Sequence, residues 1–162
     1  MCSVPARHRT NISTSICSRS QPALLLRVAQ ARVPLLPTDT QLLGGLELGG
    51  VPIATKVSSL TGLPAIFIRK QAKTYGTGRL AEGADVTGKR ITLIEDVITP
   101  GGAVHDATLA LRAQGARVTV VVCAIDRSDT VGGQLTDVDI DTRAVLTREQ
   151  LAASACRVVD TP

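Results

Sequence analysis

Apolar and polar positions follow one another along the chain in blocks that predict short buried strands between amphipathic helices. Runs of aliphatic and β-branched residues predict strands at 42–47, 65–68, 91–94 and 117–125. Apolar residues at helical spacing predict helices at 22–33, 52–60 and 102–114, with a short closing helix after 147. Strands that alternate with helices predict an α/β fold, in which helices flank a parallel sheet.

Several element ends carry recognisable signals. Ser20 is available as N-cap of the first helix, which ends before Pro34 and Pro37, and Gly115 can end the third helix. Thr147 and Gln150 match a capping box. Residues 134–146 have no strong periodicity and predict a loop with a short edge strand.

The first 20 residues differ in composition from the rest, so we expect a tail at 1–20 and one domain at 21–162. The tail is rich in Ser, Thr and Arg and has no acidic residue. A disordered tail is favoured over a transit peptide or a start away from a natural boundary. Residues 1–38 hold five arginines and no acid, whereas the remainder has 13 bases and 14 acids. The net charge of +4 therefore does not indicate a nucleic-acid surface.

Two further features bear on the compartment. No apolar run is long enough to span a membrane. The four cysteines are scattered and form no CxxC pair, so neither a zinc site nor a disulfide framework is expected. These features predict a cytoplasmic protein without a membrane partner.

The stretch from Ile91 to Ala103 combines a buried strand with polar chemistry. Glu95 and Asp96 follow the strand, and we expect both at its mouth because carboxylates are costly inside a core. The following Thr-Pro-Gly-Gly turn opens a helix, whose N–H groups and dipole suit a phosphate. Acceptors for hydroxyls beside donors for a phosphate match a ribose 5-phosphate. The alternative is an ordinary turn with solvated acids.

Two other segments suggest ligand contact and leave alternatives open. The glycine-dense stretch 44–50 either lets the backbone approach a ligand closely or forms a tight strand-to-helix turn. Residues 69–85 carry bases first and glycines later, without apolar periodicity. Such a long cationic loop suits a lid over a polyphosphate, although it can equally be a solvated basic loop.

Four motifs carry a resemblance to a known family. They are GLELGGVPIA at 45–54, RKQAKTYGTG at 69–78, EDVITPGGA at 95–103 and AIDR at 124–127. Together they resemble the type I phosphoribosyltransferases, and among these the orotate phosphoribosyltransferases. The resemblance implies a Rossmann-like fold with a five-stranded parallel sheet. It also implies transfer of the phosphoribosyl group from 5-phosphoribosyl 1-diphosphate (PRPP) to orotate for pyrimidine biosynthesis, with Mg²⁺. The expected assembly is a homodimer in which each lid covers the partner's site.

The resemblance also implies roles for individual residues. Lys73, Glu95 and Asp96 would be catalytic, the acids by accepting hydrogen bonds from the ribose hydroxyls. The residues expected to bind PRPP are Arg69, Lys70, Lys73, Tyr75, Glu95, Asp96, Val97, Ile98, Thr99, Pro100, Gly101, Gly102 and Ala103. Thr99 and Arg127 would contact orotate. Glu47, Leu48 and Gly49 would follow the pyrophosphate. No protein side chain is expected to be a strong metal ligand, because substrate oxygens and water hold the ion.

Two departures from the family pattern keep other functions open. Pro100 removes one N–H from the phosphate turn, which predicts weaker phosphate binding. Residues 1–20 do not resemble the segment that covers orotate in the family. A regulatory or degenerate protein that binds PRPP with little catalysis is the main alternative. A relative that uses another base is the next.

Overall fold

The computed structural model describes residues 20–70, 81–99, 102–127, 133–147 and 150. Residues 1–19 of the tail predicted at 1–20, the lid residues Lys73 and Tyr75, and the turn residues Pro100 and Gly101 lie outside these ranges. The elements are α2 (Pro22–Gln30), η1 (Val33–Leu35), β1 (Leu42–Leu46), α3 (Gly50–Thr61), β2 (Ala65–Ile68), β3 (Ala81–Glu82), β4 (Arg90–Ile94), β5 (Val97–Ile98), α4 (Gly102–Ala113), β6 (Arg117–Asp126), η2 (Gly133–Val138) and β7 (Asp141–Thr147).

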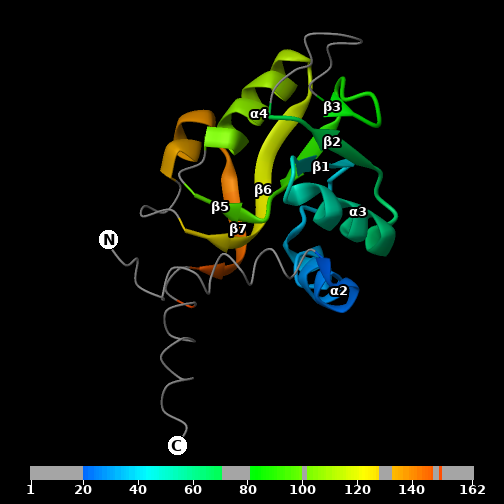
Figure 1. Cartoon of the computed structure of the whole chain (residues 1–162). Helices are drawn as coiled ribbons and strands as arrows, with labels where there is room; N and C mark the ends of the chain where they lie inside the picture. The colour runs from blue at the N-terminus through cyan, green and yellow to red at the C-terminus, as the bar shows by residue number, and fades with distance from the viewer. Residues whose placement is uncertain (1–19, 71–80, 100–101, 128–132, 148–149, 151–162) are drawn as a thin grey trace, which may run out of the picture.

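One twisted sheet organises the described chain (Figure 1). Strands β2, β1, β4, β6 and β7 are neighbours in that order and all run parallel. Short β5 also runs parallel to β6, whereas two-residue β3 pairs antiparallel with β2 at the edge. The predicted parallel α/β sheet is therefore confirmed. Its parallel strands place their carboxyl ends at one edge, where ligands bind in this class of fold.

Helices cover both faces of the sheet, and two aliphatic clusters fill the space between the layers. Figure 1 shows α4 on one face and α3 with α2 on the other. Val104, Ala107 and Leu111 of α4 are buried, as their spacing predicted. On the opposite face, Ile53 and Val57 of α3 pack in a second buried cluster. The near absence of aromatic residues suits this aliphatic packing.

The glycine-dense stretch after β1 brings α3 close to the sheet. A Cβ on Gly50 would collide with the carbonyl oxygen of Ile94, at the end of β4. A Cβ on Gly45 would lie 2.9 Å from the Cβ of Ala54 and 3.0 Å from the carbonyl oxygen of Gly50. For these two glycines, close helix-to-sheet packing supports the interpretation as a tight strand-to-helix turn.

The first helix differs from its prediction at both ends. Gln21 occupies the N-cap position and makes no capping hydrogen bond through its side chain, so Ser20 is not the cap. The α-helix ends at Gln30 rather than Val33, and Val33–Leu35 form a 3₁₀ turn. Pro34 disfavours the α conformation at Val33, which explains the early end.

The segments predicted as loops contain more structure than their sequences indicated. Residues 133–147 form a 3₁₀ turn and the seven-residue strand β7, which pairs with β6 along most of its length. Residues 81–82, inside the predicted lid, form β3 against β2. Pairing with a neighbouring strand, which local periodicity does not reveal, creates both strands.

The capping box is confirmed. The N–H of Thr147 donates to Gln150 Oε1 at 2.9 Å, and the N–H of Gln150 donates to Thr147 Oγ1 at 3.3 Å.

Within the described ranges, no helix has both the length and the apolar character that a membrane crossing requires.

Candidate active site

The acid pair lies between the end of β4 and the start of β5, and both of these strands pair with β6. β4 stops at Ile94 and β5 resumes at Val97, both on the same side of β6. Across the break, the N–H of Glu95 donates to Val122 O at 3.1 Å, and Asp96 O accepts from the N–H of Ala124 at 2.9 Å. The backbone pairing is thus nearly continuous. Glu95 and Asp96 therefore follow the end of β4, as predicted, and a second short strand, β5, begins at Val97.

Asp96 is buried, which corrects the expectation that both acids lie at the mouth. It is 6% exposed, whereas Glu95 is half-buried. Glu95 Oε1 accepts a hydrogen bond from the N–H of Asp96 at 2.7 Å. Burial of a carboxylate requires a compensating charge or hydrogen bonds, and Arg32 supplies a nearby positive charge.

Arg32 is fully buried, and sequence reasoning missed it. Its Nη1 donates to Val28 O at 2.8 Å and its Nη2 to Glu95 O at 3.3 Å. Burial lowers the pKa of Arg32 to about 10, against opposing attraction from Cys123, Asp96 and Glu95. The side chain therefore stays cationic at neutral pH. One signal was present: Leu25, Ala29 and Arg32 share a helical face by their spacing.

The loop that follows the acids is described in part. Ile98 is 3% exposed and its side chain lies in the core, so its predicted role in binding PRPP stays a prediction that could involve only its backbone. Val97 is half-buried and Thr99 is exposed. Helix α4 then begins at Gly102, as predicted. The N–H groups of its first turn are oriented toward this edge because the helix starts there.

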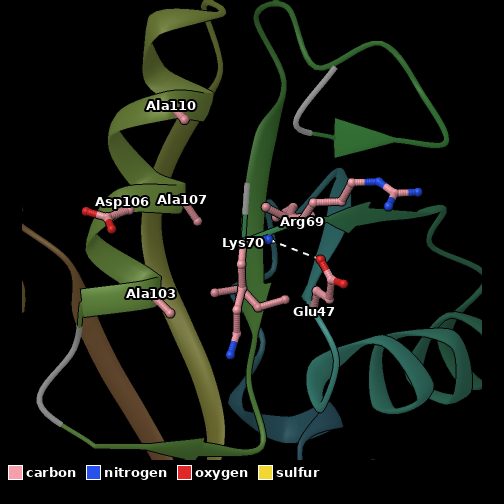
Figure 2. A pocket seen from close by; sticks show the side chains of 9 residues that line it. Glu47, Arg69, Lys70, Ala103, Asp106, Ala107 and Ala110 are labelled. Carbon is pink, nitrogen blue, oxygen red and sulfur yellow. Dashed lines mark hydrogen bonds between the residues drawn. The ribbon is translucent and has the colours of Figure 1, made fainter. Parts of the chain in front are cut away.

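A pocket of about 420 Å³ lies at the same edge, between the start of α4 and the ends of β1 and β2 (Figure 2). Its walls comprise Leu46, Glu47, Ile68, Arg69, Lys70, Ala103, Asp106, Ala107 and Ala110. Three segments predicted separately to bind one ligand, at 45–54, 69–78 and 95–103, therefore contribute to one cavity. The Lys70 N–H donates to Glu47 Oε2 at 3.1 Å, which joins two of these segments.

The charged side chains around the pocket have distinct partners. Arg69 forms an ion pair with Glu82 of β3, with 3.1 Å between Nη2 and Oε1. Asp106, which the sequence analysis did not select, is three residues beyond Ala103 on α4. Its side chain is 82% exposed and is turned away from Lys70 in Figure 2. The Ala residues of α4 thus leave the cavity open opposite Glu47 and Lys70.

Other described residues of the predicted set lie at this edge without lining the pocket. Leu48 is 74% exposed and Gly49 is buried, and the peptide bond between Glu47 and Leu48 is cis. Arg127 is half-buried beyond the end of β6, and its N–H donates to Ile98 O at 2.9 Å. Glu95 and Asp96 are not among the pocket's lining residues. The structure therefore brings part of the predicted set into one cavity and leaves the acid pair outside its walls.

Solved structures of known proteins share this fold. A phosphoribosyltransferase from Corynebacterium diphtheriae matches with a TM-score of 0.72 and 31% identity, covering 83% of this chain and 81% of that one. Orotate phosphoribosyltransferase from Mycobacterium tuberculosis, in complex with PRPP, matches with a TM-score of 0.70 and 26% identity over 83% of this chain and 80% of that one. The fold is that of a type I phosphoribosyltransferase.

Sequence similarity narrows the class further. No family model matches the chain. An orotate phosphoribosyltransferase from a Nocardioides species is 66% identical over 135 residues, which are 83% of this chain and 75% of that protein. A second, from Methanospirillum hungatei, is 41% identical over 121 residues, which are 75% of this chain and 69% of that protein. The chain belongs to the orotate phosphoribosyltransferase family.

Proposed function

We propose that this chain transfers the 5-phosphoribosyl group from PRPP to orotate, giving orotidine 5′-phosphate and pyrophosphate. The observation that carries the proposal is the pocket shared by Glu47, Lys70 and Ala103, each from a different motif of the family. The high identity to a relative named for this activity supports the choice of orotate over another base.

The acid pair would act on the ribose. In the reaction, the bond between the sugar and the diphosphate weakens and the ring gains positive charge. Carboxylates that accept hydrogen bonds from the ribose hydroxyls stabilise that charge. Glu95 and Asp96, held at the strand break, are the proposed pair. The 5-phosphate would be bound by Thr99 and by the first turn of α4, at Gly102 and Ala103, together with Gly101 of the preceding turn.

The diphosphate would be bound by basic side chains of the segment that follows β2. Lys70 lines the pocket beside Glu47. Arg69 is paired with Glu82, so diphosphate binding would exchange a carboxylate partner for a phosphate. Lys73 and Tyr75 would complete this set as parts of the lid, with Lys73 neutralising the leaving group. The loop at Glu47–Gly49 would lie along the pyrophosphate.

Orotate would be recognised through its carboxylate. Arg127 extends beyond the end of β6 at the ligand edge and is half-buried, which suits a cation that pairs with a bound anion. Thr99 is exposed near the same edge and offers a hydroxyl to the base. These two residues are the proposed contacts to orotate.

Magnesium and a second copy of the chain complete the proposal. Among the described residues, no three His, Cys, Asp or Glu side chains are grouped as a metal site would require. The ion would be held mainly through the oxygens of PRPP and water, with no strong protein ligand. When bound, magnesium neutralises charge on the diphosphate. A homodimer in which each lid covers the partner's site is the proposed assembly.

The test is to follow orotate absorbance with the purified chain. Orotate should disappear only with both PRPP and Mg²⁺ present, and chelation of the metal should stop the reaction. Binding of PRPP measured by calorimetry, without any consumption of orotate, would refute catalysis. That result would indicate the regulatory function instead.

A further inference from the structure

Arg32 is unusual because it is a fully buried cation that contacts the backbone of the acid pair. Its exposed fraction is 0%, and its Nε has no hydrogen-bond partner. A fully buried guanidinium with an unsatisfied nitrogen is costly for stability alone. The cost indicates that the position serves something other than packing.

The contacts of Arg32 connect the first helix to the strand break. Nη1 donates to the Val28 carbonyl in the last turn of α2, and Nη2 donates to the Glu95 carbonyl between β4 and β5. The side chain thus joins α2 to the point where the acids leave the sheet, 63 residues further along the chain. Asp96 and Glu95 also attract the guanidinium electrostatically.

We propose that Arg32 is a positioning residue that holds the backbone of the Glu95–Asp96 break in the geometry that grips the ribose hydroxyls. The inference rests on the proposed function for its kinetic consequence, although the fixation of the break is independent of substrate. Arg32 does not touch PRPP in this proposal. It acts through the Glu95 carbonyl and through its charge, which compensates the burial of Asp96.

Arg112 provides a matched control, because it binds backbone carbonyls without being near the acids. Its Nε donates to Val118 O at 3.1 Å and its Nη1 to Val138 O at 2.7 Å. Val118 is near the start of β6, at the opposite edge of the sheet from the break. Loss of Arg112 should therefore disturb folding without disturbing the ribose site.

The experiment compares Arg32→Met, Arg32→Lys and Arg112→Met in the full chain. Arg32→Met should lower kcat/KM for PRPP about 10- to 100-fold, since small displacements of catalytic groups have effects of this size. The KM for orotate should change less than twofold if Arg127 is undisturbed. Arg32→Lys should restore part of the loss, because a lysine keeps the charge but not the two-carbonyl fork. Arg112→Met should leave both KM values and kcat unchanged.

A second readout separates this inference from the proposed function. Amide hydrogen exchange, followed by NMR, should speed up at Glu95 and Ala124 in Arg32→Met and Arg32→Lys, and stay unchanged there in Arg112→Met. A wild-type chain without activity would refute the proposed function, while the exchange rates still decide the role of Arg32. If Arg32→Met does not fold, Arg32→Lys decides alone. A folded Arg32 variant with wild-type exchange at the break and wild-type KM for PRPP overturns the inference.

Discussion

The two ends of the parallel sheet are built differently. At the amino end, turns close on one another through backbone hydrogen bonds, such as Gly88 N to Gly115 O at 2.9 Å and Arg117 N to Lys89 O at 2.8 Å. At the carboxyl end, a strand breaks at Glu95 and Asp96, and a cavity opens beside Lys70. In these turns at the amino end, backbone groups pair with one another, whereas the pocket at the carboxyl end is lined by the charged residues Glu47, Arg69 and Lys70.

The same side-chain type has a different role at each end. Arg112, half-buried, joins the carbonyls of β6 and the turn before β7. Arg32, fully buried, lies under the acid pair and carries the higher desolvation cost. The arginine at the amino end therefore contributes to stability, whereas the one at the carboxyl end orients functional groups at some expense of stability.

The sharpest test of this contrast is a pair of lysines. Lys73→Ala should lower kcat about 10²- to 10³-fold, because the leaving diphosphate loses a positioned cation. Lys89 is an exposed lysine at the amino end, so Lys89→Ala should leave kcat unchanged. Orotate absorbance measures both variants, and urea unfolding checks that both are folded. Equal activity of the two variants would contradict the contrast.

Two glycine substitutions test whether the close packing of α3 against the end of β4 contributes to stability. Gly50→Ala should lower the free energy of unfolding by about 2–3 kcal/mol, because the new Cβ meets the backbone of Ile94 and α3 must shift. Gly102→Ala introduces a Cβ with no atom within 4 Å, so its unfolding free energy should be unchanged within about 1 kcal/mol. Urea denaturation measures both, and an equally stable Gly50→Ala would show that α3 does not depend on this approach.

A substitution in the phosphate turn should strengthen ligand binding, with a smaller effect than the substitutions above. Pro100→Thr restores a backbone N–H and should tighten PRPP binding by about fivefold, which corresponds to one added hydrogen bond of about 1 kcal/mol. Titration calorimetry with PRPP measures the dissociation constant. An unchanged or weaker constant would show that this N–H does not point at the ligand.

The smallest effect concerns the buried thiol of Cys123. Burial raises its pKa to about 12 from an ordinary value of 9.0. The stability that the neutral thiol contributes is fully present below pH 9 and is lost as pH rises toward 12, since only the unfolded thiol ionises in that window. Between pH 9 and 10 the wild type should lose about 1 kcal/mol more than Cys123→Ala does. Urea unfolding at each pH measures this difference, and parallel pH profiles of the two proteins would refute it.

Local patterns predicted most of the elements because burial imposes its period directly on the residues. The strand before Glu95 and the inner face of α4 follow this rule, and the capping box at Thr147 follows from hydrogen bonds between residues three positions apart. Strands that form by pairing with a strand distant in sequence were predicted poorly. β3 and most of β7 exist because β2 and β6 lie beside them, and neither sequence shows strong alternation.

The residues of this chain by themselves determined the α/β class, the motifs and the basic segment after β2, because each depends on neighbours within a few positions. Only the tertiary structure decided that Asp96 is buried, that Arg32 donates to the carbonyl of the neighbouring Glu95, and that Glu47 and Lys70 share a cavity with Ala103. Each of these depends on groups far apart in the chain. A buried charge is tolerated only where the fold places a partner beside it. When that partner comes from a distant part of the chain, a local sequence pattern cannot predict it.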